Sequence, residues 1–357
     1  MVKKKLTEYY RDKRVLVTGH TGFKGSWLVK FLETLGANVY GYSLENSSIP
    51  NHYSLFNIND INEVKGDILD VNLLKKTFEN VKPDIVFHLA AQALVTASYK
   101  NPVETYQTNV NGTANILEAI RGCESVKSVI CITTDKVYEN KEWNYAYREI
   151  DQLGGHDPYS SSKACCEILV SSFRNSFFNI SEFGIKHNTL IATARAGNVI
   201  GGGDWSDNRL FPDIVKSASI NESVKIRNGN SIRPWQHVLD CLNGYLILGS
   251  RLIERDSSCA TSWNFSPNID QTRNVLSVVK IASHEWDKVK FDIAPRSNTF
   301  HEAKNLMLDN SKAINELNWY PKWDTEVSIK KTIKWYREFY ENNNVITDNQ
   351  ISEFLNK

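Results

Sequence analysis

The sequence lacks several features that would place it in a specialised class of protein. It has no excess of either charge, since 42 basic and 41 acidic side chains leave a formal net charge of +1. No overall field therefore favours a polyanion such as nucleic acid, or a membrane surface. The first 13 residues are charged and contain no apolar run long enough for a signal peptide or a bilayer span. We therefore expect a cytoplasmic protein.

Cysteine is scarce and shows no paired spacing. None of the six cysteines stands in a C-x-x-C pair, and two are neighbours within a helical pattern. We expect reduced thiols in the core rather than disulfides, and no His, Asp or Glu spacing indicates a metal site. The cysteines are Cys123, Cys131, Cys165, Cys166, Cys241 and Cys259.

What the sequence does have is the pattern of an α/β protein. Of its 357 residues, 41% are hydrophobic and 23% are charged, as in ordinary globular domains. Short apolar runs alternate with amphipathic stretches, which predicts parallel strands joined by crossover helices. Strands are expected at residues 14–18, 38–42, 84–89, 128–132 and 188–194. Helices are expected at residues 25–35, 71–80, 103–121 and 159–178. The predicted fold is a doubly wound, Rossmann-like parallel sheet with a smaller mixed lobe on the C-terminal side.

The chain divides into three expected parts. Residues 14–197 form a dinucleotide-binding domain, to which later segments return. After Gly197 the regularity falls away, and a glycine run with Pro-containing turns indicates a substrate-binding lobe over residues 198–340. The last part, residues 341–357, is polar and is expected to fray.

A glycine-rich turn follows the first expected strand. Residues 18–25 read T-G-H-T-G-F-K-G, at the junction of a strand and a helix. Glycines there allow a tight turn, the approach of a pyrophosphate to backbone N–H groups and close packing of helix on sheet. A tight turn without a ligand is the alternative, but the position favours a dinucleotide site. The expected cofactor contacts are Gly19, Thr21, Gly22, Phe23, Lys24 and Gly25.

The second strand bears on which dinucleotide is bound. An acidic residue that holds the adenosine ribose is expected at its end, but Ser43 stands there. No arginine cluster is present at that place for a 2′-phosphate either, so NAD is favoured over NADP. Asp67 closes a later strand; it either accepts a hydrogen bond from the adenine amino group or caps the helix expected at residues 71–80.

A tyrosine and a lysine have the spacing of a catalytic pair. Tyr159 and Lys163 are four residues apart at the start of an expected helix, so they share one helical face. An ammonium near a phenol lowers the tyrosine pKa, which lets the phenolate take a proton from a hydroxyl while hydride leaves the same carbon. Exposed helices also carry such pairs by chance. Here the pair comes after the glycine turn and after a T-T-D segment that closes a strand.

Together these motifs resemble the extended short-chain dehydrogenase/reductase family. The glycine turn, H-L-A-A-Q at residues 88–92, T-T-D at residues 133–135 and the Tyr-Lys pair carry the resemblance. Strings at residues 18–27, 134–138, 195–205, 231–238 and 301–303 further resemble the CDP-glucose 4,6-dehydratases within that family. The resemblance implies an NAD-dependent enzyme that oxidises a CDP-hexose at C4, removes water across C5 and C6, and returns hydride to C6. It implies cofactor contacts at Ser43, Asp67, Ile68, Leu89, Ala90, Ala91, Thr108, Thr133, Tyr159 and Lys163.

The resemblance also implies a set of catalytic roles. Tyr159 is the base at the sugar O4, and Thr134 holds that oxygen, unless its hydroxyl only caps backbone at the strand end. Asp135 is the acid for the departing O6. Lys136 stands where the dTDP-glucose and GDP-mannose dehydratases carry a glutamate as base at C5, and it serves as a base only if its pKa is lowered. Besides a catalytic pair, Asp135 and Lys136 could form a structural ion pair or an electrostatic clamp on the substrate.

Arginines in the second half are expected to hold the substrate pyrophosphate, because guanidinium chelates phosphate oxygens. Arg209 and Arg233 are the candidates, although each alone could be a surface arginine. Trp205 and Trp235, with His237 nearby, either wall the nucleotide base or pack in the core of the lobe. The expected substrate contacts are Gln92, Asn198, Arg209, Leu210, Arg227, Arg233, His237, Arg296 and His301.

Two rival functions use the same residues differently. A nucleotide-sugar 4-epimerase needs Tyr159, Lys163 and Thr134 but has no use for an acid at Asp135, whereas a non-catalytic NAD-binding regulator needs none of the four. A dehydratase for another nucleotide-hexose is a further alternative. The resemblance implies a homodimer or a dimer of dimers, paired through the helices expected at residues 103–121 and 159–178, with no nucleic acid or membrane partner.

Overall fold

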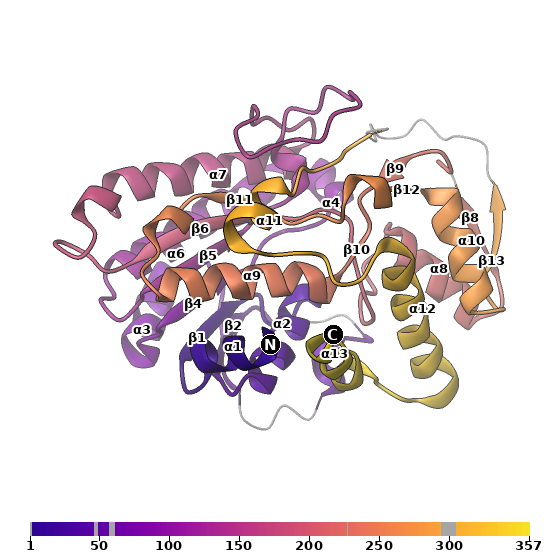
Figure 1. Cartoon of the computed structure of the whole chain (residues 1–357), viewed down its shortest axis with the longest axis horizontal. Coiled ribbons are helices and arrows are strands. Elements are labelled where there is room, and N and C mark those ends of the chain that lie inside the picture. The colour runs from indigo at the N-terminus through magenta and orange to yellow at the C-terminus, as the bar shows by residue number, and fades with distance from the viewer. Residues whose placement is uncertain (1, 46–48, 57–60, 227, 294–304) are drawn as a thin grey trace.

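A computed structural model describes residues 2–45, 49–56, 61–226, 228–293 and 305–357. At its centre lies a seven-stranded sheet in which every neighbouring pair of strands is parallel (Figure 1). The strand order β3-β2-β1-β4-β5-β6-β11 confirms the predicted doubly wound sheet. The strands are β1 (Arg14–Thr18), β2 (Asn38–Ser43), β3 (Asn62–Lys65), β4 (Ile85–His88), β5 (Ser128–Ile132), β6 (Leu190–Arg195) and β11 (Ser262–Asn264).

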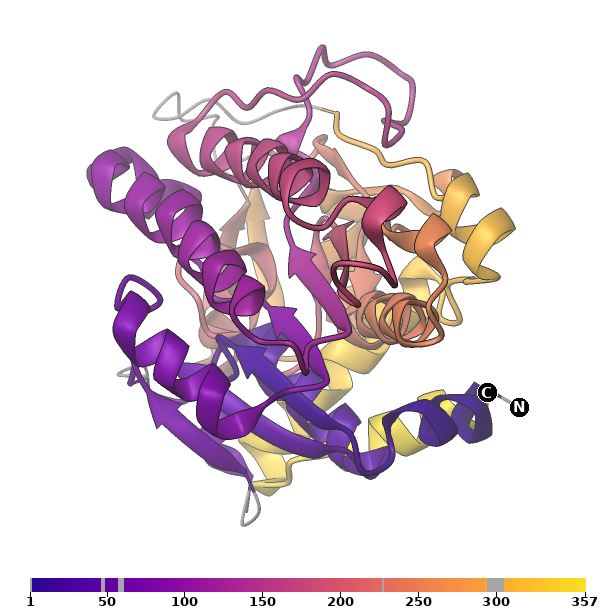
Figure 2. The ribbon, with the colours of Figure 1, turned by 90° about the vertical axis from the view of Figure 1, so that its left-hand side faces the viewer.

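Helices cover both faces of this sheet. One face carries α3 (Val71–Val81), α6 (Gly112–Arg121) and α7 (Pro158–Ser176), and Figure 2 shows α6 and α7 side by side on it. The other face carries α2 (Phe23–Thr34) and α9 (Val238–Ile253). Among the described helices, none is long and apolar enough to cross a membrane.

The helix expected at residues 103–121 is present but changes its winding in the middle. It begins as α5 (Pro102–Tyr106), just after α4 (Val95–Lys100), and passes through a π-helical turn, Gln107–Asn111, into α6. The Asn109 side chain leaves this turn to bond the main chain of Gln92, accepting from its N at 2.8 Å and donating to its O at 3.0 Å. The wider turn therefore fixes the loop that follows β4.

The second half of the chain is more regular than the sequence pattern indicated. Its elements lie mostly in a lobe beside the sheet, on the right in Figure 1. They are β7 (Val199–Ile200), α8 (Leu210–Ser219), β8 (Ser223–Ile226), β9 (Ile232–Arg233), β10 (Gln236–His237), β12 (Arg273–Asn274), α10 (Val275–Glu285), β13 (Lys290–Ile293), α11 (Ser311–Leu317) and α12 (Thr325–Asn342). The long helix α9 returns to the sheet between β5 and the outer helices α1 and α11, so it is buried on nearly every side.

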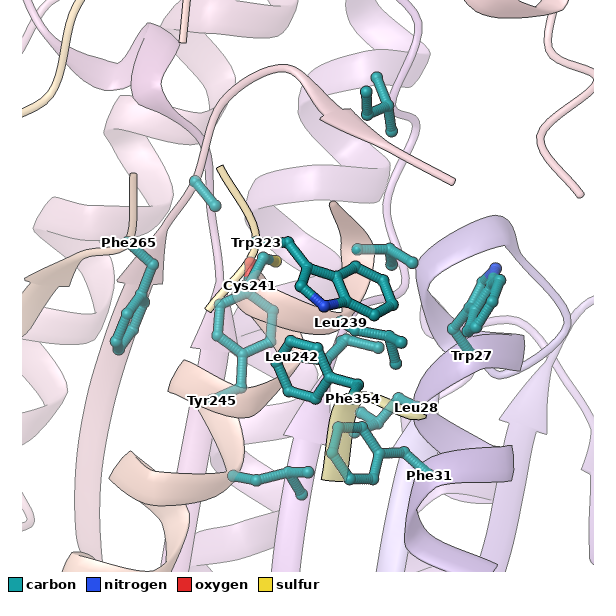
Figure 3. Close-up of a cluster of buried hydrophobic side chains, with 14 of the residues drawn as sticks. Trp27, Leu28, Phe31, Leu239, Cys241, Leu242, Tyr245, Phe265, Trp323 and Phe354 are labelled. Carbon is teal, nitrogen blue, oxygen red and sulfur yellow. The ribbon is translucent and has the colours of Figure 1, made fainter. Parts of the chain in front are cut away.

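Both ends of the chain are helical and packed. In α1 (Val2–Tyr10), the buried Tyr10 donates its hydroxyl proton to the Leu246 carbonyl of α9, at 2.8 Å. In α13 (Thr347–Asn356), the Phe354 ring lies against Phe31 and Trp323, with centroids 6.3 and 5.2 Å away (Figure 3). The prediction that the last residues fray is therefore wrong, because the apolar face of α13 completes the core over α2.

Candidate active site

A cavity of about 1880 Å³ opens where the carboxyl ends of the strands meet the lobe. Pockets for one small ligand usually measure about 300–1,000 Å³, so this cavity has room for two ligands together. Apart from His237, every predicted site residue that the structure describes lines this cavity. The predicted contacts Arg227, Arg296 and His301 lie outside the described residues.

The glycine turn forms one wall of the cavity. Helix α2 begins at Phe23, two residues earlier than predicted, and its N-cap Gly22 makes no side-chain cap bond, so the first-turn N–H groups remain for a ligand. Gly19 has φ +72°, and a Cβ there would lie 2.8 Å from the Ala90 N. A Cβ on Gly25 would lie 2.1 Å from the Gly19 O. The turn therefore requires both glycines.

The second and third strands end beside this turn. The Ser43 hydroxyl lies 3.2 Å from that of Thr21, and both residues line the cavity. Asp67 also lines the cavity and accepts from the Leu69 N at 2.9 Å. Helix α3 is instead capped by Asp70, which accepts from the Leu73 N, so the alternative that Asp67 caps this helix is wrong.

Tyr159 lies at the start of α7, with its phenol in the cavity and 9% of the residue exposed. Burial raises its pKa to about 12, while a hydrogen bond with Thr134 and the charge of Arg209 act in the opposite direction. The sequence analysis expected Lys163 to supply that acidifying charge. Instead, the Lys163 Nζ donates to the Ile132 carbonyl at 3.1 Å, and burial lowers the lysine pKa.

Asp135 stands at the end of β5 in the same wall. The Thr134 Oγ1 donates to its Oδ1 at 2.9 Å, whereas its Oδ2 is buried and has no hydrogen-bond partner among the described residues. Gly197 leaves room for this carboxylate, since a Cβ there would lie 1.9 Å from the Oδ2. Lys136 also lines the cavity. No ion pair joins it to Asp135 in the described part of the chain, so the structural ion pair is not supported.

Thr134 contacts the backbone and also lines the cavity. Its Oγ1 accepts a long hydrogen bond, 3.4 Å, from the Lys136 N, which is the backbone-capping arrangement. The same side chain lies within hydrogen-bonding reach of Tyr159 and lines the cavity. The backbone contact therefore orients a hydroxyl that still faces the site.

The predicted phosphate ligands lie on the lobe side of the cavity. The Arg209 Nη1 is 3.0 Å from the Oδ2 of the buried Asp204, which anchors the guanidinium. Arg233 is only 6% exposed, so it is not a surface arginine. Trp235 lines the cavity, whereas Trp205 packs against the rings of α12 and belongs to the lobe core.

His237 was predicted to contact the substrate, and this prediction is wrong. The residue is fully buried, outside the described cavity wall, between the rings of Trp27 and Trp323. Its Nδ1 accepts from the Leu239 N at 3.2 Å and so caps α9. Burial lowers its pKa to about 3, which keeps the ring neutral. The chain turns into the core at this point, which the sequence pattern did not reveal.

Matches to known proteins run along most of the chain. The family described as GDP-mannose 4,6 dehydratase matches residues 16–332. The chain belongs to this family. It is 43% identical over 350 residues to the CDP-glucose 4,6-dehydratase of Salmonella typhimurium, covering 97% of each chain.

Solved structures share the fold. The epimerase Mth375 of Methanothermobacter thermautotrophicus has a TM-score of 0.83 at 25% identity, covering 96% of this chain and 97% of that one. The dTDP-glucose 4,6-dehydratase of Bacillus anthracis, solved in complex with NAD, has a TM-score of 0.75 at 21% identity, covering 91% of this chain and 97% of that one. The architecture of this dehydratase-family chain is therefore shared with both dehydratases and epimerases.

Several groups in the site were missed by the sequence analysis. The loop between the short 3-10 helix η3 (Asp135–Val137) and α7 supplies part of the cavity wall, through residues 139, 140, 142 and 152–157. Asp204 anchors Arg209, and Asn109 fixes the loop that contains Gln92. No sequence signal marked Asn109, because its helical neighbours Thr105 and Thr113 are polar as well. Asp204 carried no periodic signal, because it lies in a loop.

Proposed function

We propose that this chain is an NAD-dependent CDP-glucose 4,6-dehydratase. The observation that carries the proposal is Asp135, whose Oδ2 has no hydrogen-bond partner among the described residues and which lies in the same cavity wall as Thr134 and Tyr159. A 4-epimerase needs the tyrosine and the threonine but has no use for this acid. The 43% identical relative from Salmonella typhimurium, named CDP-glucose 4,6-dehydratase, supports the choice of substrate.

The residues of the cavity fit NAD. The first turn of α2 offers N–H groups to a pyrophosphate, and the missing Cβ atoms of Gly19 and Gly25 leave the turn open. We assign Ser43 and Asp67 to the adenosine end of NAD and Lys163 to the catalytic end, and all three line the cavity. The solved dTDP-glucose dehydratase of the same fold was obtained with NAD, which supports this cofactor. When bound, NAD supplies the acceptor for the C4 hydride and returns it to C6.

The side chains divide the chemistry between them. Tyr159 takes the proton of the sugar O4, so that C4 becomes a ketone as its hydride leaves. The ketone acidifies the C5 proton, for which Lys136 is the candidate base, and Asp135 protonates the O6 that departs as water. One water is lost, and hydride at C6 with a proton at C5 completes CDP-4-keto-6-deoxyglucose. Thr134 holds the O4 against Tyr159 throughout.

The lobe holds the nucleotide part of the substrate. We assign residues 14–197 mainly to the cofactor and residues 198–340 mainly to the substrate. Arg209 and Arg233 are placed to chelate the pyrophosphate, with Asn198, Leu210 and Gln92 beside them in the cavity wall. Of the two tryptophans, Trp235 is the one that can wall the base.

A second copy of the chain is the proposed partner. Val103 is 68% exposed and Ile168 is 59% exposed, on α5 and α7. These helices lie side by side, and the Tyr106 hydroxyl of α5 donates to the Ser161 Oγ of α7 at 2.8 Å. Two such apolar helix pairs related by a two-fold axis bury one another in a homodimer.

The experiment compares CDP-, dTDP-, GDP- and UDP-glucose with catalytic NAD. The product is followed by the alkali-induced absorbance of a 4-keto-6-deoxy sugar. We expect the highest kcat/KM with CDP-glucose. CDP-galactose without any keto sugar identifies a 4-epimerase instead, and no turnover of any substrate identifies a non-catalytic NAD-binding protein.

A further inference from the structure

A buried ion pair lies behind the wall of the cavity. The Glu167 carboxylate and the Arg195 guanidinium are each only 3% exposed, and both residues lie outside the described cavity lining. The Oε1 accepts from the Arg195 Nε at 2.9 Å, and the Oε2 accepts from the Nη2 at 2.8 Å. Removing two charges from water is costly, so such a pair is weak evidence of a gain in stability.

The pair joins the elements that carry the proposed catalytic groups. Tyr159, Lys163 and Glu167 are spaced four residues apart along α7, so they line one face of that helix. The first two reach the cavity. The third, one turn deeper, lies under the ends of β5 and β6, where its Oε2 also accepts from the Thr193 Oγ1 at 2.7 Å.

Thr133 links the ion pair to the proposed catalytic residues Thr134 and Asp135. Its Oγ1 donates to the Glu167 Oε1 at 2.5 Å, and its main-chain N–H donates to the Ala194 O at 2.9 Å. Both the side chain and the main chain of Thr133 are therefore held in place. Thr134 and Asp135 follow directly, so the orientation of Thr133 sets where their side chains enter the cavity.

Arg195 extends the same network to the loop that walls the cavity. Its Nη1 donates to the Tyr138 hydroxyl at 2.7 Å, and the Tyr138 hydroxyl donates to the Asn264 Oδ1 at 2.8 Å. The Asn264 Nδ2 in turn donates to the Tyr147 carbonyl at 2.9 Å. The bonds run from helix α7 through two strand ends to the loop after Asp135.

We propose that Glu167 and Arg195 are positioning residues for the dehydration. Through Thr133, they hold Thr134 and Asp135 in register with Tyr159 on α7. The inference rests on the proposed function, since it assigns a purpose to the placement of those three side chains. Because the pair lies outside the described cavity wall, its loss should affect the rate and not the binding.

The first test is Glu167→Gln in the holoenzyme, with CDP-glucose as substrate. A misplacement of reacting groups by about 1 Å costs on the order of 100-fold in rate, so kcat should fall by about 10- to 100-fold. The KM for CDP-glucose and the Kd for NAD should stay within about threefold. Asp240→Asn is the matched control, because Asp240 is an equally buried carboxylate that accepts from the Lys322 and Trp323 N atoms, outside the described cavity wall. It lowers the Tm but keeps kcat.

A second pair of variants keeps both charged residues of the ion pair. Thr133→Ser keeps the hydroxyl that donates to Glu167 and should retain most of the rate. Thr133→Val keeps the shape but removes the donor, so its kcat should fall as in Glu167→Gln. The proposal is overturned if Glu167→Gln and Thr133→Val keep wild-type kcat, or if kcat and ligand binding fall together.

The proposed function can be wrong while the positioning role of Glu167 and Arg195 is right. The wild-type enzyme is therefore assayed first on all four nucleotide-hexoses. A wild type that is inactive on CDP-glucose but active on another of them refutes the assigned substrate. The same variants then test the positioning role on that other substrate.

Discussion

At the scale of single residues, the site depends on how charges surround one phenol. Tyr159 is buried, which raises its pKa to about 12, and the positive charge of Arg209 partly opposes this effect. Arg209 is in turn held by Asp204 at 3.0 Å. The residue proposed to bind the substrate phosphates therefore also tunes the proposed base.

Removing that charge gives a prediction about pH. A base must lose its proton before it acts, so kcat/KM rises with pH through the pKa of Tyr159 in the free enzyme. Because Arg209 lowers this pKa, Arg209→Met should raise it and move the rising limb to higher pH. Loss of a phosphate contact, worth about 1.5–3 kcal/mol, should also raise KM by about 10- to 100-fold.

The matched control is Arg233→Met, since Arg233 lines the same cavity but does not figure among the main influences on the Tyr159 pKa. Arg233→Met should raise KM without moving the rising limb of the pH profile. Both profiles come from initial rates measured from neutral pH up to about pH 12, where the pKa of Tyr159 places the limb. A limb that stays in place in Arg209→Met argues against this electrostatic coupling.

Gly197 gives a second prediction at this scale. Because a Cβ there would lie 1.9 Å from the Asp135 Oδ2, Gly197→Ala must displace the carboxylate. Turnover should fall by at least about tenfold, as expected for a misplaced acid. Gly122→Ala is the control, since its added Cβ meets nothing closer than 3.7 Å and should leave turnover unchanged. Wild-type product formation by Gly197→Ala would remove Asp135 from the mechanism.

Local motifs predicted much of the site at residue level. The glycine turn, Thr134 to Lys136 and the Tyr159 pair all line the cavity, and the first two follow strands whose carboxyl ends point there. His237 could not be placed in this way. Whether a strand end such as β10 turns toward a cavity or into the core depends on tertiary packing, which a motif does not encode.

At the scale of elements, the helices of the regular first half of the chain were predicted and the long helix α9 was missed. The helices α3 and α7 each have one face on the sheet and were predicted within about two residues. Helix α9 is buried on nearly every side and follows the short strands after Gly197, where the regular alternation of strands and helices ends. The π-helical turn at Gln107–Asn111 also left no signal, because it changes hydrogen bonding and not composition.

The packing of α13 leads to a prediction about stability. Phe354 is fully buried between α2 and the segment that leads into α12, so Phe354→Ala should leave a cavity. Such a substitution costs about 3–5 kcal/mol of unfolding free energy. Denaturant unfolding should show this loss while kcat at low temperature is retained. If Phe354→Ala is as stable as the wild type, the last residues fray after all, as their polar composition predicted.

At the scale of the whole molecule, the sheet edge and the lobe enclose one large cavity. Helices α5 and α7 expose apolar side chains on the surface. Val103→Glu places a charge in the middle of the proposed two-fold contact. We expect the sedimentation coefficient to change from that of a dimer to that of a monomer. Ile220→Glu, at an equally exposed apolar position at the end of α8, should leave the dimer intact. A wild type that sediments as a monomer would refute the contact.

In the proposed mechanism, one hydride moves from C4 to C6 within a single hexose. CDP-glucose deuterated at C4 is incubated with the wild-type enzyme and catalytic NAD, and the product is analysed by NMR. The proposed mechanism predicts deuterium at C6 of the 4-keto-6-deoxy product. Product that carries no deuterium at C6, or that requires stoichiometric NAD, would contradict it.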